Sequence, residues 1–222
     1  MPYSIIIPIY NEYNTLKTLL KNLKRYYKLG HEIIIIDDGS TDQSKLVLKK
    51  CSFINLLVLD KNHGKGIAIR TGLEKSKNEK IIIYDGDLEL KIGDISKFMN
   101  LDRKNKIYSI MGFRFKHLGL IRSGVDWGNF IFTTFFNLLY RSCHKDILCC
   151  AKSFYRKDIP IKELKSIGFD IDVEISSYLT LNNRGKYIPQ IFLHYNRRSL
   201  LEGKKLKISD GWVILKRILL SS

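Results

Sequence analysis

The stretch that most constrains the fold is Ile81–Glu89, a short apolar run that ends abruptly in acidic residues. Its apolar part has the pattern of a strand buried on both faces, and Asp85, Asp87 and Glu89 follow it at alternate positions. Burying unpaired charge is costly, so such a cluster fits poorly in a core. Carboxylate oxygens do suit Mg²⁺ or Mn²⁺. Taken alone, the stretch indicates either a metal site or a polar turn after a strand.

Two other apolar runs also end in polar or acidic residues. Tyr3–Ile9 leads into Tyr10 and Glu12, and Glu32–Ile36 leads into an Asp-Asp pair that ends at Asp38. Helical patterns separate the runs, and this alternation predicts βαβ units on a parallel sheet. Ligands bind such sheets at the carboxyl ends of the strands. The convergence of three strand ends therefore predicts an α/β fold with a nucleotide and metal site at one edge.

The remaining elements are predicted from the same periodicities. Pro8 has no N–H to donate, so it is expected to mark the end of the first strand. Ser40 or Thr41 is expected to cap a helix that runs to about Lys50. Further strands are predicted at Ile54–Leu59, Lys80–Tyr84, Ile107–Phe115, Ile147–Tyr155 and Tyr187–His194. Further helices are predicted at Ile67–Lys77, at Trp127–Tyr140, up to Leu181, and at Trp212–Leu220, the last of them amphipathic.

The length of the chain, 222 residues, is enough for one domain with a sizeable core. We expect residues 1–222 to form that domain, with a nucleotide-binding half at about 1–90 and an acceptor half at about 91–222. No stretch approaches the roughly 18–20 uninterrupted apolar residues of a membrane-spanning helix. The start of the sequence also lacks the basic region of a signal peptide. The expected location is the cytoplasm, at the cytoplasmic face of a membrane.

The chain is strongly basic, with 38 Lys and Arg against 22 Asp and Glu and a formal net charge of +16. Such an excess reflects either a polyanionic partner or a lysine-rich proteome. The basic residues are dispersed and match no nucleic-acid-binding motif, so we expect no nucleic acid. A phosphate-bearing substrate or an anionic membrane surface is favoured. The apolar helix at 127–140 fits either a core or a membrane interface.

Two short motifs leave their roles open. Gly64-Lys65-Gly66 matches neither the P-loop nor the G-x-G-x-x-G turn. It is either a plain strand-to-helix turn with Lys65 exposed, or a turn whose amides and Lys65 approach a nucleotide. The four cysteines lack the spacing of a metal site, and the pair Cys149-Cys150 is predicted to lie in a buried strand.

These motifs together resemble those of family 2 glycosyltransferases of the GT-A type, and most closely those of dolichyl- or polyprenyl-phosphate sugar transferases. The likeness extends over nearly the whole chain. The matching segments are Ile7–Glu12, Ile36–Asp42, Asn62–Gly66 with Ala68 and Gly72, Asp85–Glu89, and Gly112–Arg114. The resemblance implies a Rossmann-like, mostly parallel central sheet flanked by helices. It also implies an enzyme that transfers a hexose from a UDP- or GDP-sugar.

By that likeness the site residues fall into three groups. Those implied to hold the base and ribose of the nucleotide sugar are Pro8, Tyr10, Glu12 and Asp38. Those implied to hold a Mn²⁺ or Mg²⁺ ion on the diphosphate are Asp85, Asp87 and Glu89, with Asp85 and Gly86 also beside the donor. The implied phosphate contacts are Arg114, Arg197 and Lys205, and Lys65 is counted only among the residues that bind the nucleotide sugar. Because the metal would assist departure of the nucleoside diphosphate, its ligand Asp87 is a candidate catalytic residue.

The implied reaction is a direct displacement at the anomeric carbon, with inversion. A polyprenyl or dolichyl phosphate acceptor is already anionic and needs no strong general base. A saccharide hydroxyl needs one, and Asp172 or Asp170 is then the candidate, although both could equally be charges at a helix N-terminus. The chain departs from the family pattern at Cys150, where glycine is expected, and at Lys204, where serine is usual. Both departures fall where the acceptor should bind.

Other functions remain as alternatives. A family 2 glycosyltransferase that acts on a saccharide hydroxyl in cell-surface polysaccharide synthesis shares all these motifs. A nucleotidyltransferase usually needs a glycine-rich loop right after the first strand, where this chain has Tyr10-Asn11-Glu12. An inactive nucleotide-sugar-binding protein is disfavoured by the intact acidic residues. Peripheral membrane contact is expected through the basic surface, the helix at 127–140 and the C-terminal amphipathic helix.

Overall fold

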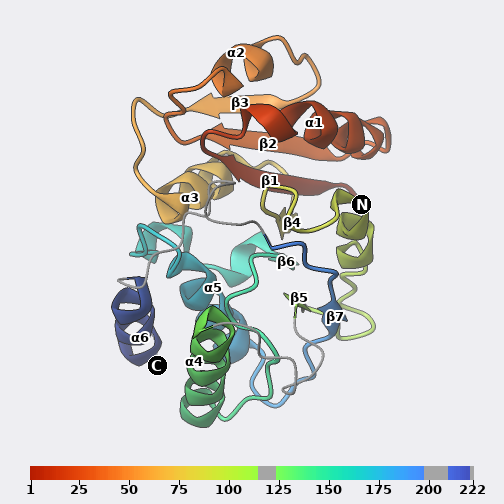
Figure 1. Ribbon diagram of the computed structural model, residues 1–222. Helices are drawn as coiled ribbons and strands as arrows, with labels where there is room; N and C mark the ends of the chain where they lie inside the picture. The colour runs from red at the N-terminus through yellow and green to blue at the C-terminus, as the bar shows by residue number, and fades with distance from the viewer. Residues whose placement is uncertain (115–123, 198–209, 221–222) are drawn as a thin grey trace.

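The protein, described by a computed structural model over residues 1–114, 124–197 and 210–220, is built on a central seven-stranded sheet (Figure 1). The strands are β1 (Tyr3–Ile9), β2 (Glu32–Asp37), β3 (Asn55–Val58), β4 (Lys80–Ile83), β5 (Ser109–Phe113), β6 (Lys152–Tyr155) and β7 (Gln190–Phe192). The α-helices are α1 (Tyr13–Lys28), α2 (Ser44–Lys49), α3 (Lys65–Lys75), α4 (Gly124–Tyr140), α5 (Ile171–Asn182) and α6 (Asp210–Leu220). Short 3₁₀ helices are η1 (Ile92–Phe98), η3 (Arg156–Asp158) and η4 (Ile161–Glu163).

The first half of the chain builds four parallel strands in the order β3-β2-β1-β4. β1 pairs with β2 from Ser4 opposite Glu32 to Ile9 opposite Asp37. Isoleucines fill β1, β2 and β4 and are buried on both faces of the sheet, which is why these runs are continuous rather than alternating. The parallel register places the carboxyl ends of the three strands at one edge, as predicted.

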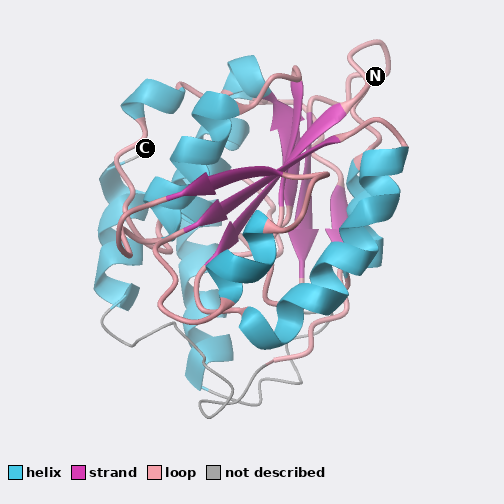
Figure 2. Ribbon diagram, turned by 90° about the horizontal axis from the view of Figure 1, so that it is seen from above, coloured by secondary structure: helices cyan, strands magenta, loops and turns pink. Residues whose placement is uncertain are grey.

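Helices cover both faces of the sheet (Figure 2). α1, α2 and η1 pack on one face, where Leu16 and Leu23 of α1 are fully buried. α3 and α5 pack on the other face, through residues such as Ala68 and Ile175. The predicted α/β architecture, a mostly parallel sheet flanked by helices, is therefore confirmed.

The second half of the chain inserts one antiparallel strand into the sheet. β6 runs antiparallel to both of its neighbours, with Ile82 of β4 opposite Ser153 on one side and Ile110 of β5 opposite Ser153 on the other. β5 and β7 are parallel to each other. The sheet order is therefore β3-β2-β1-β4-β6-β5-β7, and β6 joins the two halves of the molecule.

The strand predicted at Ile147–Tyr155 is wrong in its first part, because only Lys152–Tyr155 pairs as β6. The Lys152 ammonium donates hydrogen bonds to the carbonyls of Ile147 and Cys149, and Ser176 Oγ donates to the Ile147 carbonyl at 3.1 Å. Side chains therefore satisfy the carbonyls of Ile147 and Cys149, and only at Ala151, whose carbonyl accepts the N–H of Gly112, does β5 bond this segment. Cys149 is buried as predicted, but it lies in a loop.

Pro8 lies within β1, opposite Ile36, rather than at the strand end. Successive residues of a strand direct their backbone groups to opposite neighbours, and Ile6 directs its carbonyl to Tyr84, on the β4 side. Pro8 therefore faces the same side as Ile6. Because β1 pairs with β4 only as far as Ile6, the missing N–H of Pro8 leaves no gap in that ladder.

The helix predicted to start at Ser40 or Thr41 begins at Ser44 instead. The Thr41 N–H donates to Asn11 Oδ1 at 2.8 Å, and the Ser44 N–H donates to Asp42 Oδ1 at 2.8 Å. These side chains hold the preceding residues in a loop. β3, β5 and β7 are each shorter than the predicted strands.

α4 and α6 pack together against α5 at the lower end of the molecule in Figure 1. Phe136 and Tyr140 of α4 and Ile214 and Ile218 of α6 share a buried cluster with Val173 of α5. The Tyr140 hydroxyl donates to the Ile218 carbonyl at 3.2 Å. Throughout the described ranges, no helix combines the length and the apolar character that a membrane span requires.

The packing of α3 on the sheet predicts a strict requirement for glycine at one position. A Cβ at Gly72 would lie 2.6 Å from Ile6 Cγ2 and 2.7 Å from Ile36 Cδ1. We expect Gly72→Ala to lower the free energy of unfolding by about 1–2 kcal/mol, because overpacking outweighs the gain in helix propensity. Urea unfolding followed by circular dichroism measures the change.

Gly128→Ala in α4 is the matched control, because a Cβ there meets no atom closer than Phe132 Cε2 at 3.8 Å. This variant should be as stable as the wild type or up to about 1 kcal/mol more stable. Equal unfolding free energies for the two variants would contradict the close packing of α3.

Candidate active site

The acidic residues after β4 form a loop that lies directly on the end of β1. Asp87 Oδ1 accepts the N–H of Glu89 at 3.0 Å. A Cβ at Gly86 would lie 2.3 Å from Ile9 Cδ1, so only glycine fits where the loop crosses β1. This close approach places the carboxylate of Asp87 within the electrostatic influence of Glu12, at the start of α1.

Negative charge is concentrated at this loop. Burial, together with the charges of Asp85, Glu89 and Glu12, raises the pKa of Asp87 to about 7. Within the described ranges, no three or more side chains of the ligating types are arranged as a ready-made metal cage. Asp85, Asp87 and Glu89 nevertheless fit a hard divalent cation by their chemistry, because they offer oxygen ligands where negative charge is in excess.

Lys65, the first residue of α3, reaches into the same edge of the sheet. Its Nζ lies 2.9 Å from Asp85 Oδ1 and 3.0 Å from Asp172 Oδ2. Burial would lower the pKa of Lys65, but the carboxylates of Asp172 and Asp85 outweigh burial and raise it well above its ordinary value. The alternative prediction, a plain strand-to-helix turn with Lys65 exposed, is therefore wrong, because only 11% of this side chain is exposed.

β6 supplies a second buried lysine that no sequence motif singled out. Lys152 Nζ lies 3.8 Å from Asp172 Oδ1, and 1% of the Lys152 side chain is exposed. The sequence did hold a signal, since a lysine interrupts the otherwise apolar run that was predicted as a strand. Cys150 also lies at the site, because its thiol hydrogen-bonds to Asp85. Burial raises the pKa of that thiol well above its ordinary value.

The acidic residues at the start of α5 face two different partners. Asp172 contacts the two lysines, whereas Asp170 and Glu174 pair with Arg217 of α6 at 3.0 and 3.3 Å. Glu174 also accepts backbone N–H groups from the loop before α5. The structure therefore brings Asp172 into the candidate site and ties Asp170 to α6.

Pro8, Tyr10 and Glu12, predicted to hold the base and ribose, lie at the carboxyl end of β1 and in the turn that follows it. Pro8 and Tyr10 are half-buried, and Glu12 is buried. The Glu12 N–H donates to Ser44 Oγ at 3.0 Å, and its carboxylate accepts a hydrogen bond from Thr15 Oγ1 at 3.1 Å. These bonds fix the turn beside the acidic loop.

Asp38, predicted to hold the same part of the donor, shapes the edge through its carboxylate. It accepts the N–H groups of His63 at 2.8 Å and Gly64 at 2.9 Å. The preceding residue, Asp37, is fully buried and accepts the N–H of Ser40 at 3.0 Å. Asp38 thus holds the loop that delivers Lys65 to the site.

Arg114 is oriented by a buried carboxylate. Its Nε and Nη2 donate to the two oxygens of Asp146 at 2.8 and 3.1 Å, and Asn129 of α4 donates to Asp146 at 3.0 Å. Burial would lower the pKa of Arg114, but Asp146 raises it well above its ordinary value. A two-point contact of this kind fixes the plane of the guanidinium.

Arg197 follows β7 on a segment that runs along the acidic loop. The Asn196 N–H donates to the Glu89 carbonyl at 2.9 Å, and the Arg197 guanidinium lies 5.8 Å from the Tyr195 ring centre. Burial and then the charge of Glu89 raise the pKa of Tyr195 to about 12. Tyr195 is thus a further site residue that no sequence pattern indicated. Lys205 lies outside the described residues.

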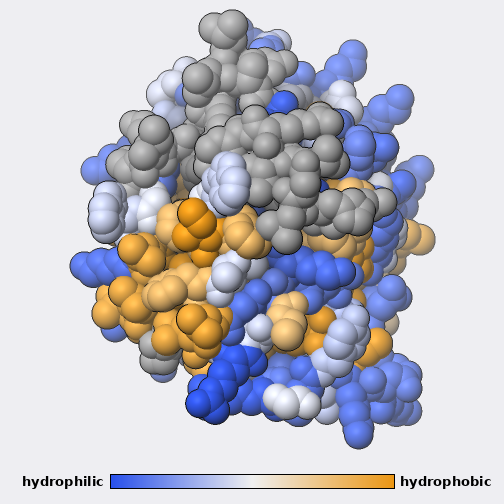
Figure 3. All heavy atoms as spheres, turned by 60° about the horizontal axis from the view of Figure 1, so that its bottom comes forward, coloured by the Kyte–Doolittle hydropathy of each residue, from blue (hydrophilic) through white to orange (hydrophobic). Residues whose placement is uncertain are grey.

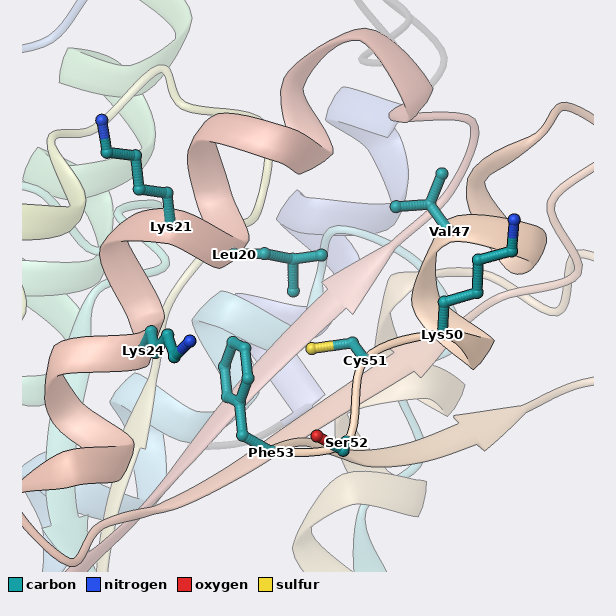
Figure 4. Close-up of a pocket in the computed structure, with 8 residues that line it drawn as sticks. All are labelled: Leu20, Lys21, Lys24, Val47, Lys50, Cys51, Ser52 and Phe53. Carbon is teal, nitrogen blue, oxygen red and sulfur yellow. The ribbon is translucent and has the colours of Figure 1, made fainter.

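Two cavities lie away from this edge of the sheet. One lies between α1 and the segment from α2 to β3, and Figure 4 shows its lining residues, Leu20, Lys21, Lys24, Val47, Lys50, Cys51, Ser52 and Phe53. The other lies where α4 and α5 end. Neither cavity is lined by a predicted site residue. The candidate site is therefore the carboxyl edge of the sheet, between β1, β2 and β4 on one side and α5 and β6 on the other.

The fold is similar to that of glucosyl-3-phosphoglycerate synthase from Mycobacterium tuberculosis, solved in complex with Mn²⁺, UDP and glucosyl-3-phosphoglycerate. The TM-score is 0.73 at 17% sequence identity, and the match covers 99% of this chain and 79% of that protein. At this identity the match shows the fold alone. The predicted GT-A type of fold is therefore confirmed.

The family model described as Glycosyl transferase family 2 matches residues 4–161, and the chain belongs to that family. Human dolichyl-phosphate beta-glucosyltransferase is 37% identical over 108 residues, which cover 42% of this chain and 33% of that protein. The undecaprenyl-phosphate 4-deoxy-4-formamido-L-arabinose transferase of Pseudomonas savastanoi pv. phaseolicola is 33% identical over 118 residues, which cover 49% of this chain and 34% of that protein. The matches thus span about a third of each of these relatives.

From the raised pKa of Asp87 we predict how the stability of the metal-free protein depends on pH. The pKa of Asp87 is about 7 in the folded protein against an ordinary 3.8. At a pH between these two values, Asp87 is therefore protonated in the folded state and ionised in the unfolded state. The free energy of unfolding therefore falls as the pH rises from about 4 to about 7. In EDTA, we expect Asp87→Asn to stabilise the protein more at pH 8 than at pH 4.5, by about 2–4 kcal/mol.

Urea unfolding of both proteins at the two pH values measures this difference. Glu74→Gln is the control, because the Glu74 side chain is exposed on α3 and lies outside the acidic loop. A stabilisation by Asp87→Asn that is the same at both pH values would show that Asp87 is ionised normally.

Proposed function

We propose that the protein transfers a hexose from a nucleotide-diphosphate sugar to a polyprenyl or dolichyl phosphate, with inversion at the anomeric carbon. The observation that carries this proposal is the pairing of acidic residues in the acceptor half. In the part of that half that the structure describes, each buried carboxylate forms an ion pair with a lysine or an arginine. These carboxylates are Asp146, Asp170, Asp172 and Glu174.

A saccharide hydroxyl acceptor would need a carboxylate that takes its proton. Asp172 is the candidate beside the acidic loop, but its oxygens face Lys65 at 3.0 Å and Lys152 at 3.8 Å. Its charge serves to neutralise these two ammonium groups. A phosphate acceptor brings its own negative oxygen and needs no base. The ion pairs therefore favour a lipid phosphate over a saccharide hydroxyl as the acceptor.

The named relatives support the same class of acceptor. One is named for a dolichyl phosphate and the other for an undecaprenyl phosphate, while the sugars in their names differ. What these two names share is a polyprenyl phosphate. We carry this shared element over to the present chain, with the base of the donor, UDP or GDP, and the sugar left open.

On the donor side, the turns after β1 and β2 are proposed to hold the base and ribose, through Pro8, Tyr10, Glu12 and Asp38. Asp85, Asp87 and Glu89 are proposed to hold Mn²⁺ or Mg²⁺, which would supply Lewis-acid stabilisation of the leaving diphosphate. The Mn²⁺ and UDP in the solved neighbour of the same fold support this choice of ligands. Gly86 lets the acidic loop approach the end of β1 closely enough to place these groups together.

The basic residues of the site are proposed to orient the phosphates. Lys65 is proposed to contact the donor diphosphate, because its ammonium already lies against Asp85 at the N-terminus of α3. Arg114 and Arg197 are proposed to contact phosphate oxygens, since guanidinium groups bind them in a fixed geometry. Asp146 holds Arg114 in orientation. Lys205 stays a phosphate contact proposed from the sequence alone.

Peripheral contact with the cytoplasmic face of a membrane is proposed through α4 and α6. Figure 3 shows apolar side chains gathered in one patch over these helices. The exposed large apolar or aromatic residues of the two helices include Trp127, Ile131, Leu138, Trp212, Val213 and Leu220. Exposed apolar surfaces of this kind mark interaction sites, and the net charge of +16 suits an anionic lipid surface. α4 also contacts the site, because Asn129 donates to the carboxylate that orients Arg114.

An acceptor comparison tests the proposed reaction. With Mn²⁺ and a panel of UDP- and GDP-sugars, we expect nucleoside diphosphate release and a glycolipid product when polyprenyl phosphate is present. The matched control is the corresponding polyprenol, which has the same chain but a hydroxyl that needs a base, and it should give no product. Equal transfer to the polyprenol or to a saccharide would contradict the proposed acceptor, and pyrophosphate release would indicate nucleotidyl transfer.

Asp87→Asn tests the role of the acidic loop in the same assay. We expect transfer to fall by about 10²–10³-fold, because stabilisation of the leaving diphosphate is lost. Glu74→Gln, which removes an exposed carboxylate from α3, should transfer at the wild-type rate. Normal turnover of Asp87→Asn with Mn²⁺ would contradict the assignment of Asp87.

Vesicle flotation tests the membrane surface. We expect the protein to float with vesicles that contain phosphatidylglycerol at low salt. The double change Trp127→Ala with Trp212→Ala should weaken this binding by about tenfold or more, because 53% and 78% of these side chains are exposed for insertion. Tyr27→Ala, on α1 and 50% exposed, is the control. Flotation that the double change leaves unaltered would exclude α4 and α6 as the contact.

A further inference from the structure

We propose that Lys65 is the internal counter-cation of the acidic loop that carries Asp85, Asp87 and Glu89, at the carboxyl edge of the sheet. We further propose that it couples the binding of the metal to the binding of the donor diphosphate. The inference rests on the proposed function, because it takes a metal and a nucleoside diphosphate as the ligands of this edge. It gives Lys65 a role before the donor arrives, and it gives Asp172 a positioning role in place of proton transfer.

The ammonium of Lys65 occupies both carboxylate oxygens of Asp85, so a metal ion that binds Asp85 would have to displace it. The ammonium lies 2.9 Å from Oδ1 and 3.0 Å from Oδ2 of Asp85, so it engages both oxygens of this carboxylate. The side chain is 11% exposed and lies over the Phe169 ring at 5.7 Å. In the protein without ligands, Lys65 therefore neutralises one of the three carboxylates proposed to hold the metal.

Metal and ammonium are competitors for Asp85. A divalent cation at this carboxylate would lie close to a positive charge in a site with little solvent, where repulsion between like charges is strong. The metal alone should therefore bind weakly. A diphosphate removes this conflict, because its oxygens offer the ammonium another anionic partner. Each ligand thus makes the site more favourable for the other.

Asp172 and Lys152 let Lys65 change partners without leaving a charge uncompensated. Lys65 is also held by Asp172 Oδ2 at 3.0 Å, so it can leave Asp85 and keep one carboxylate. Asp172 has a second cation, since Lys152 Nζ lies 3.8 Å from its Oδ1. Lys152 itself is fixed by the carbonyls of Ile147 and Cys149. Asp172 therefore holds Lys65 while Lys65 exchanges Asp85 for the diphosphate, and Lys152 compensates the charge of Asp172.

Calorimetric titration with Mn²⁺, alone and with saturating UDP or GDP, tests the coupling. For the wild type, we expect Mn²⁺ to bind about tenfold or more tightly with the nucleotide than without it, and the nucleotide to gain by the same factor from Mn²⁺. For Lys65→Met, Mn²⁺ alone should bind more tightly than to the wild type, and the coupling factor should fall below the wild-type value, to the part that direct contact between Mn²⁺ and the diphosphate supplies. Unchanged or weaker Mn²⁺ binding by Lys65→Met would overturn the proposal.

Two further variants sharpen the result. Within residues 1–114, 124–197 and 210–220, Asp172→Asn leaves Lys65 with Asp85 as its only carboxylate partner, so Mn²⁺ alone should bind more weakly than to the wild type. A variant that was merely misfolded would not move metal affinity in opposite directions for Lys65→Met and Asp172→Asn. Lys75→Met removes the same charge from the other end of α3, where the side chain is exposed, and it should titrate like the wild type.

These titrations need neither an acceptor nor turnover, so they separate this inference from the proposed reaction. Lys65-dependent coupling in a protein that does not glycosylate polyprenyl phosphate would keep the inference and overturn the proposed acceptor. Transfer to polyprenyl phosphate with a wild-type coupling factor of one would overturn the inference and keep the acceptor.

Discussion

The structure depends on a row of four charged side chains, of which Asp172 and Lys152 are buried, that joins its two halves. Asp85 and Lys65 come from the first half and Asp172 and Lys152 from the second, with contacts of 2.9, 3.0 and 3.8 Å along the row. Opposite signs alternate, so each charge is compensated where a single one would be costly to bury. The two inner members, Lys65 and Asp172, each have two partners of opposite charge, whereas Asp85 and Lys152 lie at the ends of the row. The halves are thus held together at the place where the chemistry is proposed to occur.

The first half could be predicted because its signals are local. Continuous isoleucine runs that end in carboxylates identify β1, β2 and β4, and helical spacing identifies α1 between them. The contact between Lys65 and Asp172 had no such signal, because 107 positions separate the two residues. Asp170 and Asp172 look alike in the sequence, but two positions on a helix differ by about 200° in direction. One therefore meets Arg217 and the other Lys65.

The second half was harder to predict because its apolar runs serve several kinds of structure. The run at Ile147–Tyr155 has the composition of a strand, yet its first part is a loop whose carbonyls bind the ammonium of Lys152. Likewise, the local sequence did not show that Arg114 has a carboxylate partner within the protein, whereas the fold places Asp146 against it. In both cases a partner supplied by the tertiary structure decides what the local pattern leaves open.

The position of β6 bears on how the chain reaches this fold. β6 comes late in the sequence but lies beside β4 at the centre of the finished sheet. Until it is in place, β4 is the outer strand of a four-stranded sheet, and Ile81–Ile83 border an open edge. Such edges invite pairing with other chains, and a ribosome delivers the N-terminal half first. Pairing of Lys152–Tyr155 with β4 is therefore what covers this edge in the finished sheet.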